Sequence, residues 1–155
     1  MPAYAVLGAQ WGDEGKGKII DFLASDAEVV ARFSGGNNAG HTEINDLGDF
    51  SLHLIPCGVF RTEVMNVIGN GTVVDPDVLI EEIRSLATAG IDVEGRLIIS
   101  ERAHLIMPYH IVLDTLAETA RGLSAIGTTG KGIGPAYSDK TSRTCLLYTS
   151  PSPRD

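Results

Sequence analysis

The chain has 155 residues, of which 43% are hydrophobic and 21% are charged, a composition typical of one soluble globular domain and unlike that of disordered or fibrous proteins. Twenty acidic residues against twelve basic ones give a formal net charge of −8, which disfavours non-specific nucleic-acid binding because that binding depends on neutralising phosphates. No signal-like segment and no apolar run of the ~18 residues needed to span a membrane is present, so we expect a cytoplasmic protein.

The first predicted element is a short apolar strand over residues 4–9, and the next is a helix that begins near Lys16. The glycine-rich segment 8–18, GAQWGDEGKGK, therefore lies at a strand-to-helix turn. At such a turn the first N–H groups of the helix lack internal partners and the helix dipole adds partial positive charge, so an anion is favoured. With the charges of Lys16 and Lys18 added, the segment predicts a phosphate site.

This segment is not a standard nucleotide P-loop, which has four residues between its first glycine and Gly-Lys and then Ser or Thr. The position five before Gly15 is Gln10, and Gly17 replaces the hydroxyl residue that would hold magnesium. The segment does contain two carboxylates, Asp13 and Glu14. A carboxylate beside phosphates is repelled unless it coordinates a metal ion or accepts a substrate proton, so we interpret the pair as functional and not as part of a plain turn.

A second strand is predicted over residues 28–33, and the polar, glycine-rich loop 34–42, SGGNNAGHT, follows it. This loop offers the side chain of Asn38, backbone amides around Gly40 and the imidazole of His41. An imidazole at a phosphate loop can donate a hydrogen bond to a phosphoryl oxygen during transfer. The alternative is a surface turn with an incidental histidine.

Further along the chain the pattern predicts alternating strands and helices. The expected elements are a hairpin over residues 43–55, a strand over 63–69, a helix over 75–90 that Asp75 caps, a strand over 96–100 and a helix over 109–122. This alternation favours βαβ units and a mainly parallel sheet, whose carboxyl edge is where ligands usually bind. His53, His104 and His110 fall within these elements, so we expect packing or surface roles for them. Cys57 and Cys145 lack metal-ligand spacing and are expected to be two thiols.

A third glycine-rich loop is predicted over residues 126–140, IGTTGKGIGPAYSDK, with Pro135 and Tyr137 fixing its exit. It carries Thr129 and Lys131, and Arg143 follows shortly after as a residue type suited to bidentate phosphate binding. The alternatives are a flexible linker and a solvated arginine.

Together, the motifs GAQWGDEGKGK, GGNNAGHT, LHLIPCG, IGNG and IGTTGKGIGPAY, in this order and at these spacings, resemble the N-terminal part of adenylosuccinate synthetase over about residues 4–143. The resemblance implies a P-loop-NTPase-like α/β fold with a mostly parallel sheet flanked by helices. It also implies that this chain forms an incomplete domain. It implies a GTP-dependent ligase of AMP biosynthesis that joins IMP to L-aspartate and yields adenylosuccinate, GDP and phosphate. Mg²⁺ is the implied cofactor, and a homodimer is the implied assembly.

The resemblance also implies roles for individual residues. Asp13 resembles the base that takes the N1 proton of IMP, His41 resembles the acid that stabilises the transferring phosphoryl group, and Lys16 is a third catalytic residue. Arg143 resembles an arginine that reaches the IMP site of the other subunit. Asp13 and the carbonyl of Gly40 are the implied magnesium ligands. The implied GTP contacts are Gly12, Asp13, Glu14, Gly15, Lys16, Gly17, Lys18, Gly40, His41 and Thr42. The implied IMP contacts are Asp13, Glu14, Gly15, Lys16, Asn38, Ala39, Gly40, His41, Thr129 and Arg143.

The chain departs from the family after Thr144, where CLLYTSPSPRD does not align and is rich in Ser and Pro. We therefore expect a family-like domain over residues 1–144 and an unrelated, disordered tail over 145–155. The segments that would recognise guanine and aspartate are not identifiable, so the fragment is expected to be incomplete or inactive. Two alternatives remain: a P-loop-like NTPase switch, although no NKxD motif is found, and a non-catalytic fragment that binds nucleotides.

Overall fold

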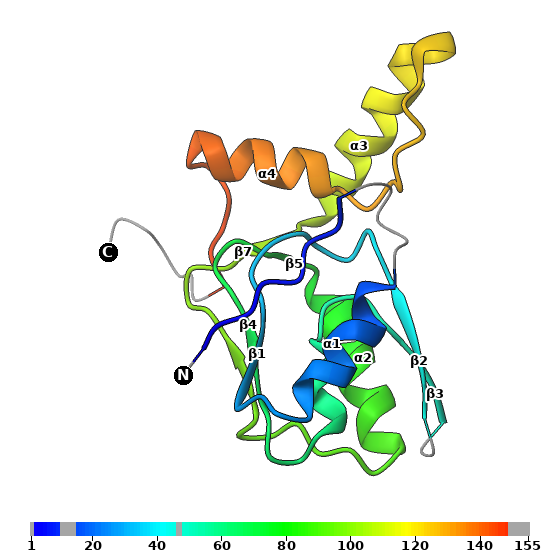
Figure 1. Cartoon of the computed structure of the whole chain (residues 1–155). Helices are drawn as coiled ribbons and strands as arrows, with labels where there is room; N and C mark the ends of the chain where they lie inside the picture. Colours follow the sequence, from blue (N-terminus) through cyan, green and yellow to red (C-terminus); the bar gives the residue numbers. More distant parts are fainter. Residues whose placement is uncertain (1, 10–14, 46–47, 149–155) are drawn as a thin grey trace.

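The computed structural model describes residues 2–9, 15–45 and 48–148 (Figure 1). The helices in these ranges are α1 (Lys16–Ala24), α2 (Pro76–Thr88), α3 (Pro108–Arg121) and α4 (Ile133–Ser142), with short 3₁₀ turns η1 (Cys57–Phe60) and η2 (Gly122–Ser124). The strands are β1 (Val29–Arg32), β2 (His41–Asn45), β3 (Gly48–Leu52), β4 (Met65–Ile68), β5 (Val73–Val74), β6 (Leu97–Ile99) and β7 (His104–Leu105). The strands and helices predicted between residues 16 and 122 are found in the predicted order, whereas the short strands β5 and β7 were not predicted.

The central sheet is parallel, with strand order β1-β4-β6. The strands β5 and β7 form a second parallel pair beyond the carboxyl ends of β4 and β6, and β2 and β3 form the expected antiparallel hairpin. The structure therefore has the predicted class, a mainly parallel sheet flanked by helices. It places the loops after β1 and β4 at one edge, the carboxyl edge of the sheet.

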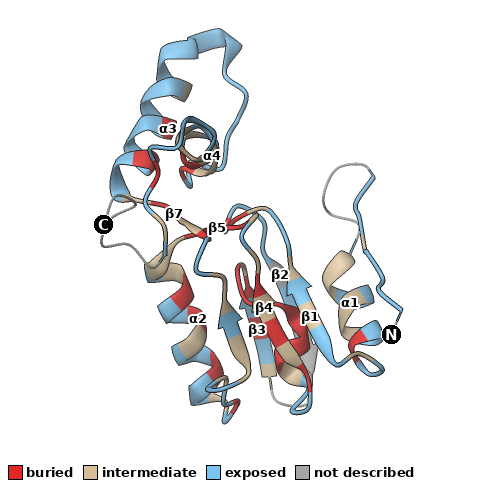
Figure 2. Ribbon diagram, turned by 90° about the vertical axis from the view of Figure 1, so that its left-hand side faces the viewer, coloured by how far each residue is buried: buried red, intermediate tan, exposed pale blue. Residues whose placement is uncertain are grey.

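One face of this sheet is covered and the other is open. Burial alternates along the strands, so that Ile68 is fully buried while Val29 and Ile98 are about half exposed on the opposite face. In Figure 1, α1 and α2 both lie to the right of β1 and β4. Figure 2 shows the buried residues gathered on β4 and along one side of α2. The main core thus lies between α2 and the covered face of the sheet.

Helix α2 forms as its sequence predicts. The Asp75 side chain accepts hydrogen bonds from the backbone N–H groups of Asp77 and Val78, and a proline occupies the first turn. The apolar stripe faces the core, where Leu79 and Leu86 are buried. The chain leaves the helix at Gly90, which has φ +79°.

The strand predicted over residues 4–9 is wrong for this structure. Residues 2–9 form no strand, and Tyr4 and Leu7 are 80% and 70% exposed. A short apolar run becomes a buried strand only when it pairs with neighbours on the sheet, because its backbone groups must find partners there. This run does not pair with β1, so its apolar side chains remain in solvent.

The third loop is shorter than predicted, because α4 begins inside it. Gly132 caps this helix at φ +73°, and Pro135 lies in its first turn, where a missing N–H costs nothing. Ile133, Ala136 and Tyr137 pack against Val73 and Ile106 in a small second core. These three residues stand at i, i+3 and i+4 and form a short apolar stripe, and its packing stabilises α4.

Helices α3 and α4 are held together by buried polar groups. The carboxylate of Asp114, which is buried, accepts a hydrogen bond from the N–H of Gly132 at 3.0 Å. The fully buried imidazole of His110 accepts from the N–H of Met107 at its Nδ1, so its Nε2 donates to Asp139 at 3.1 Å. This hydrogen bond, together with one from the Tyr109 hydroxyl, lowers the pKa of Asp139. His110 thus has the structural role expected for it.

The first residues of the predicted tail pack against β7. The N–H of Leu105 donates to the carbonyl of Leu146 at 2.9 Å, and the N–H of Tyr148 donates to Ala103 at 2.7 Å. Cys145 is buried, and burial raises the pKa of its thiol. The expected disorder is therefore wrong for residues 145–148, because they add backbone hydrogen bonds to the sheet, and residues 149–155 lie outside the described residues. Cys57 and Cys145 form no disulfide in this structure.

Candidate functional site

The second predicted loop lies where phosphate loops of parallel sheets usually lie, directly after the carboxyl end of β1. Asn38, Ala39 and Gly40 are exposed there, and β2 begins at His41. The neighbouring Asn37 is buried, and its side-chain amide donates to the Asp75 carboxylate at 3.0 Å. Asp75 therefore caps α2 with one oxygen and holds this loop with the other.

The first predicted motif is described at Gly8 and Ala9 and again from Gly15 onward. Gly12, Asp13 and Glu14 lie outside the described residues, so the structure does not place the central carboxylates. Gly15 caps α1 at φ +75°, and Lys16 opens the helix as predicted. Helix α1 contacts β2. The amino end of α1, where the helix dipole is positive, thus belongs to a helix that packs beside β2, the strand that begins at His41.

The third motif reaches the second through Tyr137. Its hydroxyl accepts a hydrogen bond from the N–H of Gly35 at 2.8 Å and donates to the carbonyl of Gly71 at 2.7 Å. Lys140, one turn further along α4, donates to the carbonyl of Asn70. Helix α4 is thereby tied to the loops after both β1 and β4.

The IGNG motif explains how closely these loops approach each other. A Cβ atom added at Gly71 would lie 2.0 Å from the carbonyl oxygen of Phe33, so only glycine fits at this crossing. The side chain of Thr72 donates to the carbonyl of Arg32 at 3.2 Å. The ends of β1 and β4 are therefore locked together beneath the candidate site.

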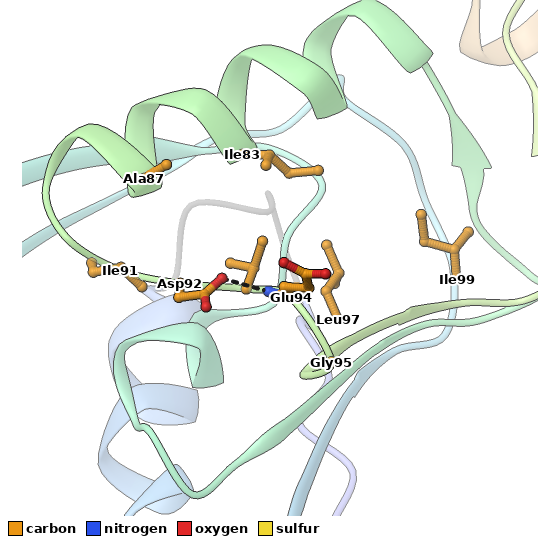
Figure 3. A pocket seen from close by; sticks show the side chains of 9 residues that line it. Ile83, Ala87, Ile91, Asp92, Glu94, Gly95, Leu97 and Ile99 are labelled. Atoms are coloured by element: carbon orange, nitrogen blue, oxygen red, sulfur yellow. Dashed lines mark hydrogen bonds between the residues drawn. The ribbon is translucent and has the colours of Figure 1, made fainter.

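Two of the surface cavities differ in their position relative to this arrangement. The smaller, of about 290 Å³, is polar and lies at the candidate site, where Asn37, His53 and Lys131 help to line it. The larger, of about 460 Å³, lies between α2 and the segment that leads into β6, and its walls are mostly apolar (Figure 3). Since that segment precedes β6, the larger cavity lies near the amino end of the sheet, away from the edge where ligands bind.

The remaining predicted residues lie on exposed segments. Thr129 is exposed between α3 and α4, and Arg143 is exposed at the end of α4. Arg143 has φ +60°, and among the described residues it is the only non-glycine residue with positive φ. Such a conformation is strained for an L-residue and is often retained where a side chain has a function.

Sequence reasoning missed the residues that hold these loops in place. Tyr137 was expected only to fix a loop exit, whereas it joins three segments. Asp75 was predicted as a cap but not as a partner of Asn37. Glu82 was not predicted at all, although it lies four residues from both Val78 and Leu86 and thus on the apolar face of α2.

Comparison with known proteins agrees with this arrangement of motifs. The family model for adenylosuccinate synthetase matches residues 5–150 of the chain. The chain belongs to the adenylosuccinate synthetase family. An adenylosuccinate synthetase of Clostridium botulinum (strain Langeland) is 60% identical over 144 residues, which are 92% of this chain and 34% of the relative. One of Dehalococcoides mccartyi is 57% identical over 143 residues, with the same coverage.

Solved structures give the same result for the fold. The fully ligated adenylosuccinate synthetase of Plasmodium falciparum matches with a TM-score of 0.83 and 45% identity over 91% of this chain and 33% of that chain. A cyanophage S-2L succinoaminodeoxyadenylate synthetase bound to dGMP and dATP matches with a TM-score of 0.68 and 27% identity, covering 90% of this chain and 38% of its own. The chain thus spans about a third of the length of its adenylosuccinate synthetase relatives.

Proposed function

We propose that this chain supplies part of the active site of a GTP-dependent ligase that joins IMP and L-aspartate to form adenylosuccinate in purine biosynthesis. The proposal rests on family membership and on one observation of the structure. Segments from three other parts of the chain contact the second loop or the strand after it: Asp75 binds Asn37, Tyr137 binds Gly35, and α1 packs against β2. This convergence supports a single site at the carboxyl edge of the sheet.

In this proposal each loop has its own task. Asp13 accepts the N1 proton of IMP, so that the 6-oxygen attacks the γ-phosphate of GTP. His41 and Lys16 stabilise the phosphoryl group as its charge develops, because phosphoryl transfer depends mainly on positioning and charge stabilisation. The aspartate amine then displaces phosphate from 6-phosphoryl-IMP. Asn38 and Thr129 contact IMP, and the segments from Gly12 to Lys18 and from Gly40 to Thr42 contact the GTP phosphates.

Mg²⁺ is part of the proposal, and the donor set fits it. The ligands would be the carboxylate of Asp13 and the backbone carbonyl of Gly40, an exposed residue, and both are oxygen donors of the hard kind that this ion prefers. Within residues 2–9, 15–45 and 48–148 no group of three or more His, Cys, Asp or Glu side chains gathers into a metal site. A magnesium ion held largely by phosphates and water needs no such group. When bound, it would neutralise charge on the phosphates.

The assembly and boundaries are proposed on the same basis. A homodimer would allow Arg143, exposed at the end of α4, to reach the IMP site of a second copy. We propose a family-like unit that includes residues 145–148, which bond to β7 and its preceding turn, and a cytoplasmic location. Within the part of the chain that the structure describes, no helix has both the length and the apolar character required to cross a bilayer.

The test is a ligase assay on two proteins: this chain, and a chimera in which it replaces the matching third of the Clostridium relative. Adenylosuccinate formed by the chimera only when IMP, aspartate and GTP are all present would support the proposal. GTP hydrolysis that needs neither IMP nor aspartate would favour a nucleotide switch. If the chimera folds but forms no product, the proposed function is wrong.

The role of Asp13 has its own test in the chimera. Asp13→Asn keeps the shape of the side chain but removes the proton acceptor, so we expect loss of 6-phosphoryl-IMP formation with GTP binding still measurable. Formation of 6-phosphoryl-IMP is measured by positional exchange of ¹⁸O between the bridging and non-bridging oxygens of the GTP β-phosphate. Normal turnover by this variant would remove Asp13 from the mechanism.

A further inference from the structure

A buried carboxylate lies behind the second loop. Glu82, in the middle of α2, is 5% exposed. It accepts hydrogen bonds from three consecutive backbone N–H groups, those of His53 at 2.6 Å, Leu54 at 3.1 Å and Ile55 at 2.9 Å. A buried charge is tolerated only when hydrogen bonds replace its water, and these three donors do so. Glu82 therefore fixes the backbone of residues 53–55 against α2.

Arg32, at the end of β1, holds the same segment from its other side. Its guanidinium donates to the carbonyl of His53 and, at 2.5 Å, to the carbonyl of Gly36. Burial lowers the pKa of Arg32, and the negative charge of Glu82 opposes that shift. The planar fork of an arginine can join two carbonyls in this way, whereas a lysine presents only a point charge.

The imidazole of His53 completes the contact with the loop. Its Nδ1 lies 3.6 Å from the carboxylate of Glu82, and a Cβ atom added at Gly40 would lie 2.8 Å from its Nε2. The loop 36–40 is thus fixed at Gly36 by Arg32 and supported at Gly40 by His53. Asn38, which lies between these two points, is exposed.

We propose that Glu82 is a positioning residue, which acts through His53 and Arg32 to hold the backbone of loop 36–40 in the conformation that presents Asn38 and Gly40 to a phosphate-bearing ligand. The identity of that ligand rests on the proposed function, whereas the control of the loop does not. The network is defined as Glu82, His53 and Arg32, and the role proposed for it is to hold the loop and not to take part in the chemistry.

The experiment compares Glu82→Gln with the matched control Glu81→Gln, which changes the adjacent, exposed glutamate on the same helix. The glutamine presents an NH₂ group to backbone donors that need an acceptor. Amide hydrogen exchange by NMR is measured at residues 36–40 and at Leu86 in the core. We expect Glu82→Gln to speed exchange in the loop at least tenfold more than at Leu86, and Glu81→Gln to change neither.

His53→Ala is the second variant, used if Glu82→Gln does not fold. His53 is 37% exposed, so its loss should leave the core intact while loosening Gly40. Titrations with IMP and with GTP are run on the same proteins, and at least tenfold weaker binding is expected wherever the loop is loosened.

Two results would overturn the inference: loop exchange that changes only as much as that of Leu86, or loosened loops that bind IMP and GTP as well as the unaltered chain does. If the unaltered chain binds neither nucleotide, the proposed function loses support, and hydrogen exchange still decides whether Glu82 positions the loop.

Discussion

Replacing Tyr137 by phenylalanine tests whether α4 is truly tied to the carboxyl edge of the sheet. The hydroxyl accepts from Gly35 at 2.8 Å and lies 2.7 Å from the carbonyl of Gly71, and the ring stays in place in the variant. Each hydrogen bond contributes a net of about 0.5–1.5 kcal/mol, so losing both should lower the free energy of unfolding by about 2 kcal/mol. For a chain of this length that corresponds to about 4–8 °C in Tm.

Urea unfolding followed by circular dichroism measures this change, and hydrogen exchange at the Gly35 amide measures its location. Tyr4→Phe is the control, because Tyr4 is 80% exposed, and we expect its effect to stay within about 0.5 kcal/mol. If Tyr137→Phe unfolds at the same urea concentration as the parent, with unchanged exchange at Gly35, the hydroxyl does not join these segments.

Three further changes follow from the same geometry. Gly71→Ala should lower the free energy of unfolding in urea by at least about 3 kcal/mol, because its Cβ would lie 2.0 Å from the carbonyl oxygen of Phe33. The control Gly134→Ala, where the added Cβ meets no atom, should be neutral or stabilising. Equal effects of the two variants would contradict the close approach at Gly71. Arg143→Gly should raise stability by about 0.5–1 kcal/mol, since it relieves a left-handed residue at φ +60°, and a lower Tm would argue against strain there. The pKa of Asp139 is lowered in the fold, so its ionised form stabilises the folded state above the ordinary aspartate pKa, and this stabilisation is lost as the pH falls through the lowered pKa. The urea midpoint should therefore fall less between pH 6 and pH 3 in Asp139→Asn than in the parent. An unchanged fall would refute this.

The sequence predicts those parts of the fold whose signals are local. Helix α2 has a capping aspartate, a proline in the first turn and an apolar stripe, and all three are found as predicted. The glycine-rich loop after β1 was also placed correctly, because turn residues and the strand before it are recognisable together. These signals depend on neighbours in the chain and not on distant contacts.

The errors concern segments whose conformation depends on distant partners. Residues 4–9 have the composition of a buried strand, but a strand needs a neighbour to pair with, and the sequence does not specify one. Helix α4 has an apolar stripe of only three residues, and it depends on Tyr137 and on the hydrogen bond from Gly132 to Asp114, both of which involve distant segments. The role of Glu82 was missed for the same reason, since its partners, the N–H groups of residues 53–55, come from a segment almost thirty residues away.

The two cysteines give the chain a pair of internal reporters. Cys57 and Cys145 are 3% and 7% exposed, one at the turn η1 beside the main sheet and the other on the segment that closes over β7. A buried thiol reacts with an external reagent only when the structure around it opens. The two modification rates can therefore report separately how often each end of the molecule opens, without any added label.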